Sequence, residues 1–253
     1  MHAKVDDMFV IAHVSDTHFG NEVQDPAVRT ARVMDHLLAM DPPPDVLVVS
    51  GDVADHGLPE EYAEARAWLD RWVGPLAVCP GNHDVRAAFV AGLGIGTRTV
   101  VETGGSRFVM LDSLIDADET GRVDLGRLGE EQLAWLAARL AEDGRPSYVC
   151  LHHPPATIGL ELMDPIRLLD GNALAAVVAD HPQVVAVLVG HAHTMAATTF
   201  AGRPLLVGGG VVSTVTADAE APPTLWYDAP PSFALHLVGD DGRVTSHWRA
   251  LPL

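Results

Sequence analysis

The chain has 253 residues, 48% hydrophobic and only 6% aromatic, which fits one large α/β domain with or without a small appendage. Its 16 lysine and arginine residues stand against 34 aspartate and glutamate residues, and the resulting net charge of −18 argues against a nucleic acid polymer as the substrate. No apolar run reaches the roughly 18 residues of a membrane span and no secretory signal precedes the first strand, so we expect a cytoplasmic protein without a membrane partner.

Short apolar runs alternate with longer amphipathic segments over the first three quarters of the chain, which is the rhythm of an α/β fold. The predicted strands are 9–14, 45–50, 76–79, 107–111, 148–151 and 184–189. The predicted helices are 26–40, 59–72, 85–92, 129–142 and 171–179.

The pattern changes after Gly190, where the segments become short and strand-like. They are 197–200, 203–207, 233–238 and 243–248, and we expect them to complete a second sheet with antiparallel strands. The predicted fold is therefore a two-sheet αββα sandwich in a single domain over residues 1–253. A small cap or loop region is expected at about 155–170 and 211–231, the latter including a long proline-rich loop from Thr216 to Pro231.

Five polar clusters each follow a predicted strand, at the carboxyl end where open α/β sheets bind ligands. They are Asp16-Thr17-His18, Gly51-Asp52, Gly81-Asn82-His83-Asp84, His152-His153 and Gly190-His191-Ala192-His193. Each cluster alone is more typical of a turn or a capped helix start. Together they supply carboxylates, a carboxamide and imidazoles, which are the ligands that Mn, Fe, Co or Zn ions prefer. The sequence therefore predicts a metal site at this edge.

The order D-x-H, GD, GNHD, H and GHxH resembles the calcineurin-like metallophosphoesterase family. Within it, the segments HVSDTHF, VVSGDVADHGLPEEY, PGNHD and LHHPP are most similar to bacterial class III cyclic nucleotide phosphodiesterases and glycerophosphodiesterases. The resemblance implies two divalent or mixed-valence metal ions (Mn, Fe, Zn or Co) in a dinuclear centre, and it assigns the ligands by position. They are Asp16, His18 and His193 on one ion, Asn82, His152 and His191 on the other, and Asp52 bridging both.

The resemblance also gives His83 a role at the transition state, as a group that stabilises charge or protonates the leaving alkoxide. We expect Asp84 to orient His83 or to cap the helix that follows, or to do both. The roles of four further residues stay open: His153 lines the pocket or packs, His56 lies at the surface, and Trp226 and Tyr227 stack on a base or cover core.

The implied reaction is hydrolysis of a small phosphodiester by a metal-bridging hydroxide, with 3′,5′-cyclic nucleotides as leading substrates. A broad-specificity phosphomonoesterase or a glycerophosphodiesterase on the same metal site is the alternative, although the short connection after His18 argues against a glycerophosphodiester preference. A non-catalytic scaffold is disfavoured because all seven ligand positions are intact. The expected partner is a small-molecule phosphate ester, and the resemblance makes a homodimer a further expectation, because relatives are often dimers.

Overall fold

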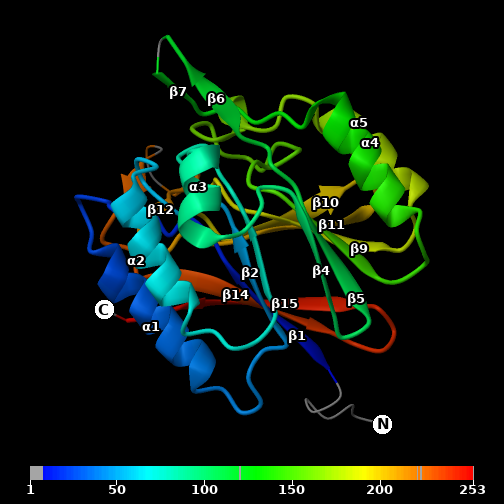
Figure 1. The fold of residues 1–253 in the computed structure, drawn as a ribbon, viewed down its shortest axis with the longest axis horizontal. Coiled ribbons are helices and arrows are strands. Elements are labelled where there is room, and N and C mark those ends of the chain that lie inside the picture. Colours follow the sequence, from blue (N-terminus) through cyan, green and yellow to red (C-terminus); the bar gives the residue numbers. More distant parts are fainter. Residues whose placement is uncertain (1–7, 120, 221, 223, 253) are drawn as a thin grey trace.

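The fold is a sandwich of two β-sheets, seen in the computed structural model of the chain, which describes residues 8–119, 121–220, 222 and 224–252 (Figure 1). The first sheet has the order β15 (Val244–Ala250), β14 (Ser232–Val238), β1 (Phe9–Val14), β2 (Val46–Ser50) and β3 (Leu76–Cys79). The second has the order β10 (Ala196–Phe200), β11 (Arg203–Val207), β9 (Val184–Val189), β8 (Ser147–Cys150), β5 (Ser106–Met110) and β4 (Thr99–Thr103).

Alternation of side chains along the central strands explains why both faces of each sheet are apolar. In β2, Val46 and Val48 belong to the core between the two sheets, whereas Leu47 and Val49 belong to the core beneath the helices. Successive side chains of a strand point to opposite faces, so a strand buried on both sides is a continuous apolar run. The run VLVVS therefore specifies a central strand.

Helices cover the outer face of each sheet. The helices α1 (Pro26–Leu38), α2 (Pro59–Leu69) and α3 (Arg86–Leu93) share a core with the first sheet. The helices α4 (Gly129–Leu140) and α5 (Gly171–Asp180) share one with the second sheet. The predicted αββα sandwich is thus confirmed. None of the helices in the described ranges is long and apolar enough to cross a membrane.

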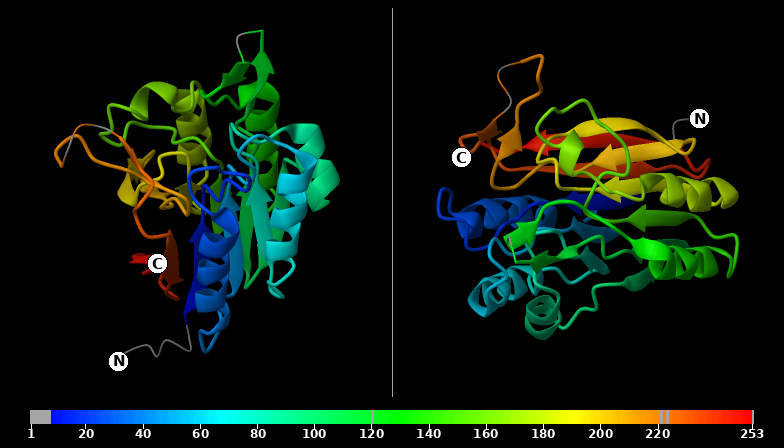
Figure 2. Two further views of the ribbon diagram at one scale, coloured as in Figure 1. Left: turned by 90° about the vertical axis from the view of Figure 1, so that its left-hand side faces the viewer. Right: turned by 90° about the horizontal axis from the view of Figure 1, so that it is seen from above.

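Two short hairpins were absent from the sequence prediction. Strands β6 (Ile115–Asp118) and β7 (Gly121–Val123) form an arm that rises beyond the ends of the main strands (Figure 2). Strands β12 (Thr214–Val215) and β13 (Leu225–Trp226) pair across the segment that the sequence assigned to a long loop. The region 155–170 contains a single 3₁₀ turn, η2 (Asp164–Ile166).

Candidate metal centre

Parallel strand directions bring the predicted site residues to one edge of the sandwich. Strands β1, β2 and β3 run parallel in the first sheet, and β8 and β9 run parallel in the second. The carboxyl ends of these five strands carry the predicted ligands, which follow them directly in the sequence. All seven predicted ligands are buried: Asp16, His18, Asp52, Asn82, His152, His191 and His193.

The backbone at this edge is strained at most of the predicted ligand positions. The φ angles are positive at Asp16 (55°), His18 (42°), Asp52 (47°), His191 (67°) and His193 (52°). Only one other non-glycine residue of the described chain, Ala201, shares this property. A left-handed conformation costs a residue with a Cβ roughly 1–2 kcal/mol, and such strain gathers at functional sites. The loops are therefore held in this shape by the surrounding fold.

Two glycines allow the ligand loops to approach one another. A Cβ at Gly51, whose φ is +95°, would lie 2.4 Å from Nδ1 of His152. A Cβ at Gly81 would lie 2.2 Å from Oδ1 of Asp52. Both distances are shorter than any real carbon contact, so the glycines of the GD and GNHD motifs are required by the packing of the site.

The first cluster joins Asp16, His18, Asp52 and His193, whose ligand atoms lie within 4.8 Å of one another. Nε2 of His18 lies 3.1 Å from Nε2 of His193 and 3.6 Å from Oδ2 of Asp52. Nε2 of His193 lies 3.5 Å from Oδ1 of Asp16. Four ligand atoms thus converge on one point from three different loops.

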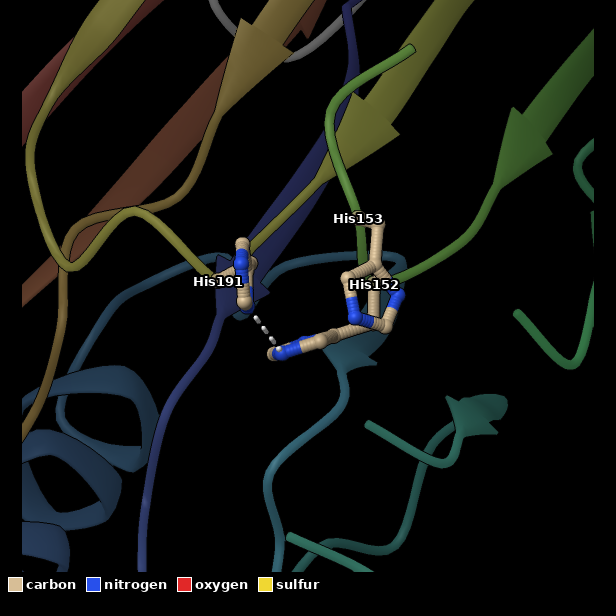
Figure 3. Close-up of side chains that lie close together, drawn as sticks. All are labelled: His152, His153 and His191. Atoms are coloured by element: carbon tan, nitrogen blue, oxygen red, sulfur yellow. Dashed lines mark hydrogen bonds between the residues drawn. The ribbon is translucent and has the colours of Figure 1, made fainter. Parts of the chain in front are cut away.

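The second cluster joins Asn82, His152 and His191 to Asp52. Oδ1 of Asn82 lies 2.9 Å from Nδ1 of His191 and 3.1 Å from Nε2 of His152. Figure 3 shows the rings of His152 and His191 turned towards each other, with 3.2 Å between the facing nitrogens. Oδ2 of Asp52 lies 3.2 Å from Nε2 of His152, so this carboxylate contacts both clusters.

Some polar atoms of the two clusters have no hydrogen-bond partner in the described part of the chain, which indicates that the clusters can bind metal ions. Oδ2 of Asp16 and Nε2 of His191 are buried without a hydrogen-bond partner among the described residues. Buried polar atoms without partners are rare in folded proteins and call for a ligand or ion. The imidazole, carboxylate and amide donors suit divalent ions of the first transition row. These residues could therefore hold metal ions.

Outer contacts fix the orientation of the histidines. Nδ1 of His18 lies 2.8 Å from Oδ1 of Asp55, and Nδ1 of His152 lies 2.8 Å from the carbonyl oxygen of Ser50. Nδ1 of His193 lies 2.7 Å from Oγ of Ser213. In each ring the occupied Nδ1 leaves Nε2 directed into the cluster, as in metal-binding histidines generally. The sequence prediction missed all three partners, although Asp55 lies only three residues after Asp52.

Electrostatics at the clusters favour a cation beside Asp52. Burial alone would raise the pKa of Asp52, but His152, His83 and His18 outweigh burial and hold this pKa well below its usual range. Burial alone would lower the pKa of His152, but the charge of Asp52 outweighs it and raises the pKa to about 9. Burial raises the pKa of Asp16 to about 6. A metal ion beside Asp52 would compete with a proton for Nε2 of His152.

His83 lies next to the clusters, with its ring edge-on to His18 at a centroid distance of 4.5 Å. Nδ1 of His83 lies 2.8 Å from the carbonyl oxygen of Asp55 and 3.4 Å from its Oδ1. Burial lowers the pKa of His83, but Asp52 and the hydrogen bond with Asp55 outweigh burial, so the net shift is upward. The carboxylate beside His83 is therefore that of Asp55.

Asp84 has a different role from the one the sequence predicted. Its carboxylate accepts hydrogen bonds from the backbone N–H groups of Gly81, Val53 and Ala54 at 2.8–3.1 Å and from the hydroxyl of Tyr62 at 3.0 Å. These donors occupy both oxygens, so the prediction that Asp84 orients His83 is wrong. The predicted helix cap is also wrong, because α3 begins after Val85. Asp84 instead ties the GD loop to the GNHD loop.

Three of the residues whose roles the sequence left open now have defined surroundings. His153 is fully buried, with Nδ1 2.8 Å from Oγ of Ser113 and its ring against Gly126, so it packs beneath the segment after the β6–β7 arm. The side chain of His56 is 51% exposed and contacts Glu61, as the surface prediction requires. Trp226 is 50% exposed, so it does not cover the core.

A cavity of about 180 Å³ opens onto the clusters. Its polar wall contains Asp52, Asn82, His83, His191 and His193, and its rim contains Arg122 and Asp124. Its apolar wall comes from both segments that the sequence assigned to a cap or loop: Leu162, Met163, Ile166 and Leu225. A small anion with one apolar substituent matches this lining.

Comparison with known proteins identifies the family. The family model "Calcineurin-like phosphoesterase" matches residues 9–195. The chain is 32% identical to the glycerophosphodiester phosphodiesterase GpdQ of Enterobacter lignolyticus, over 90% of this chain and 86% of that protein. It is 39% identical to a probable cyclic nucleotide phosphodiesterase of Synechococcus, over 64% of each chain.

A solved structure has the same fold. A dimetal phosphatase from Danio rerio superposes with a TM-score of 0.72 over 96% of each chain, at 18% identity. That likeness extends to the arrangement of strands and helices. The match of the family model over residues 9–195, most of the chain, leads to one conclusion: the chain belongs to the calcineurin-like phosphoesterase family.

Proposed function

We propose that the chain is a dinuclear metal-dependent phosphodiesterase acting on small diesters, with 3′,5′-cyclic nucleotides as its leading substrates. The observation that carries the proposal is the position of Asp52. Its Oδ2 lies 3.6 Å from Nε2 of His18 in one cluster and 3.2 Å from Nε2 of His152 in the other. The same carboxylate oxygen thus faces both clusters and could be shared by two ions, which a single-metal site would not need.

The ligand sets follow from the two clusters. Asp16, His18 and His193 would hold one ion, Asn82, His152 and His191 the other, and Asp52 both. Mn, Fe, Zn or Co ions suit these ligands. When bound, the ions supply positive charge for the phosphoryl oxygens and lower the pKa of a water molecule.

Asn82 would be held in its ligating orientation by Asp124, the residue that follows the β6–β7 arm. Its Nδ2 donates to Oδ1 of Asp124 at 3.2 Å, and this carboxylate accepts hydrogen bonds but cannot donate them. Oδ1 of Asn82 is thereby directed to His152 and His191. The neutral carboxamide adds a ligand without reducing the positive charge of the site.

His83 would protonate the departing oxygen. Its Nδ1 is occupied by the carbonyl oxygen of Asp55, so Nε2 is the nitrogen that can carry a proton to the substrate. The raised pKa of His83 favours the ring that is protonated on both nitrogens, which is the form that can donate. As the bond from phosphorus to the water oxygen forms, the ester P–O bond breaks and the leaving oxygen receives this proton.

The relatives favour diesters, and they include two substrate classes. The cyclic nucleotide class is supported by the Synechococcus relative and by the "3',5'-cyclic adenosine monophosphate phosphodiesterase CpdA" of Pseudomonas aeruginosa, 31% identical over 73% of this chain. Glycerophosphodiesters are the second candidate, because the GpdQ relative matches over more of the chain. Phosphomonoesters are the third, since the same metal site could bind them.

A substrate panel on protein purified without chelator tests the proposal. We expect about two metal ions per chain, loss of activity with a chelator and recovery with Mn²⁺ or Co²⁺. The value of kcat/KM should be higher for the diester bis(p-nitrophenyl) phosphate than for the monoester p-nitrophenyl phosphate. It should also be higher for cyclic AMP than for glycerophosphocholine. A metal-loaded protein that hydrolyses only the monoester would contradict the proposal.

A further inference from the structure

A second cavity lies beside the one that opens onto the clusters. We call them the outer cavity and the metal-side cavity, with volumes of about 370 Å³ and 180 Å³. Asn82, His83 and Arg122 line both cavities and therefore form their common boundary. The volume of the outer cavity is within the range of small-molecule sites, which starts at roughly 300 Å³.

The outer cavity is lined by residues at the start of α3 and on the β6–β7 arm. Its apolar lining comes from Val85 on one side and from Leu114, Ile115 and Ala117 on the other. Asp55, His56 and Asp116 add polar groups. This lining suits an organic group that has an apolar face and hydrogen-bonding edges, and it offers little to a free inorganic ion.

Two hydrogen-bond donors meet at the boundary. Nη1 of Arg122 lies 3.0 Å from Nδ1 of His83, and Nε of Arg122 donates to Oδ1 of Asp124 at 2.6 Å. Because Nδ1 of His83 donates to the carbonyl oxygen of Asp55, it cannot also accept from Arg122. The approach of Arg122 to His83 is therefore not a hydrogen bond. Two such donors side by side are stabilised by an anion that contacts both.

We propose that the outer cavity is the leaving-group subsite, with the phosphoryl group held between Arg122, His83 and the clusters. This inference rests on the proposed function, because it assumes that the chain hydrolyses a phosphodiester. In an in-line displacement the water attacks from the side of the clusters and the leaving oxygen departs from the opposite face. His83 lies on that face and the outer cavity lies beyond it. The occupant is the alcohol part of the ester, a sugar with its base or an aryl group.

Filling the cavity tests the inference. Ala117 is exposed at the wall of the outer cavity, so Ala117→Trp should fold and obstruct it. Val85→Trp obstructs the opposite wall at another exposed position. Ala138→Trp, on the exposed face of α4, is the matched control. The substrates are bis(p-nitrophenyl) phosphate and methyl p-nitrophenyl phosphate, which share a leaving group and differ in the group that phosphorus retains.

Both cavity variants should lower kcat/KM by at least about tenfold and by the same factor on the two diesters, a loss typical of a sterically altered pocket. Calorimetry should show weaker binding of phenylphosphonate and unchanged binding of methylphosphonate, with metal content as in the wild type. A loss on bis(p-nitrophenyl) phosphate alone would place the retained group in the outer cavity and overturn the inference. So would unchanged kinetics. Inactivity of the metal-loaded wild type on both diesters would instead overturn the proposed function.

Discussion

The carboxylate of Asp55 lies 2.8 Å from Nδ1 of His18, a predicted metal ligand, and its backbone carbonyl lies 2.8 Å from Nδ1 of His83. One residue thus orients two histidines, the predicted ligand His18 and the predicted proton donor His83. Neither contact involves a residue that precedes or follows Asp55 closely in the sequence. Its charge also favours the orientation of His18 in which Nε2 faces the cluster.

Asp55→Ala should weaken metal binding by about 10–100-fold, the usual effect of losing a carboxylate behind a metal-bound histidine. Competition of the protein with a chelating dye for Zn²⁺ or Mn²⁺ measures this affinity. Asp35→Ala is the control, because Asp35 is exposed and pairs with Arg71 at the surface. An unchanged metal affinity in Asp55→Ala would show that His18 keeps its orientation without this partner.

Asn82→Ala and Asp16→Ala should affect different ions. Oδ1 of Asn82 contacts the rings of His152 and His191 in the second cluster, and Oδ1 of Asp16 contacts the ring of His193 in the first, so each variant should lose one ion more readily than the other. Activity of Asn82→Ala should return in part at high Mn²⁺ or Co²⁺, and the titration curve of Asp16→Ala should have a different midpoint and plateau. Superimposable curves would argue against two separate sites.

His83→Ala should keep both ions and the fold but lose activity by a factor on the order of 10² to 10⁴, as expected for a positioned general acid. The loss should depend on the leaving group, because p-nitrophenolate departs without a proton whereas the sugar alkoxide of a cyclic nucleotide needs one. The measurement is kcat/KM on both substrates with metal content determined on the same samples. Equal losses would indicate stabilisation of charge on the phosphoryl group instead, and loss of an ion would make His83 a ligand.

A buried histidine pair outside the site should make stability depend on pH. Nδ1 of His13 lies 3.2 Å from Nε2 of His236, and both side chains are fully buried. Burial lowers the pKa of His13 to about 3 and, together with the neighbouring His13, lowers the pKa of His236 well below its usual range. In the unfolded chain both histidines take up protons near pH 6.5, so the free energy of unfolding should decrease as the pH falls below that value.

Urea unfolding at pH 7.5 and at pH 5.5 measures this dependence. In the double variant His13→Asn, His236→Asn, the free energy of unfolding should change less steeply with pH than in the wild type. For two protons the two slopes can differ by up to about 2.7 kcal/mol per pH unit. The comparison concerns slopes, so a lower absolute stability of the variant does not affect it. Equal slopes in the two proteins would mean that the pair accepts protons in the folded state.

The fold was predictable because its main strands and helices bury apolar side chains in regular patterns. The run VLVVS and the amphipathic segment from Pro26 each match the observed element closely. The β6–β7 arm, with sequences IDAD and GRV, has no such pattern because it projects from the sandwich and buries little. Arg122, at the boundary of the two cavities, lies on this arm and was therefore missed.

The predicted ligands converge in the structure because motifs after parallel strands meet at one edge. Their partners were harder to predict, since hydrogen bonds between distant loops leave no local signal. Ser213 contacts His193 across 20 residues, and Asp84 accepts from backbone groups about 30 residues away. The neighbours of Asp84 in the sequence do not indicate its role, because its carboxylate accepts hydrogen bonds from the N–H groups of Val53 and Ala54.

The central claim is that Asp52 is shared by two metal ions, and the metal content of Asp52→Ala tests it most directly. Elemental analysis of wild type and variant, both reconstituted with Mn²⁺ and freed of loosely bound ions, gives the number of ions per chain. We predict about two ions in the wild type and one or none in Asp52→Ala, with no measurable turnover of bis(p-nitrophenyl) phosphate, because both ions lose a ligand at once. Two ions per chain and normal turnover in Asp52→Ala would contradict the claim.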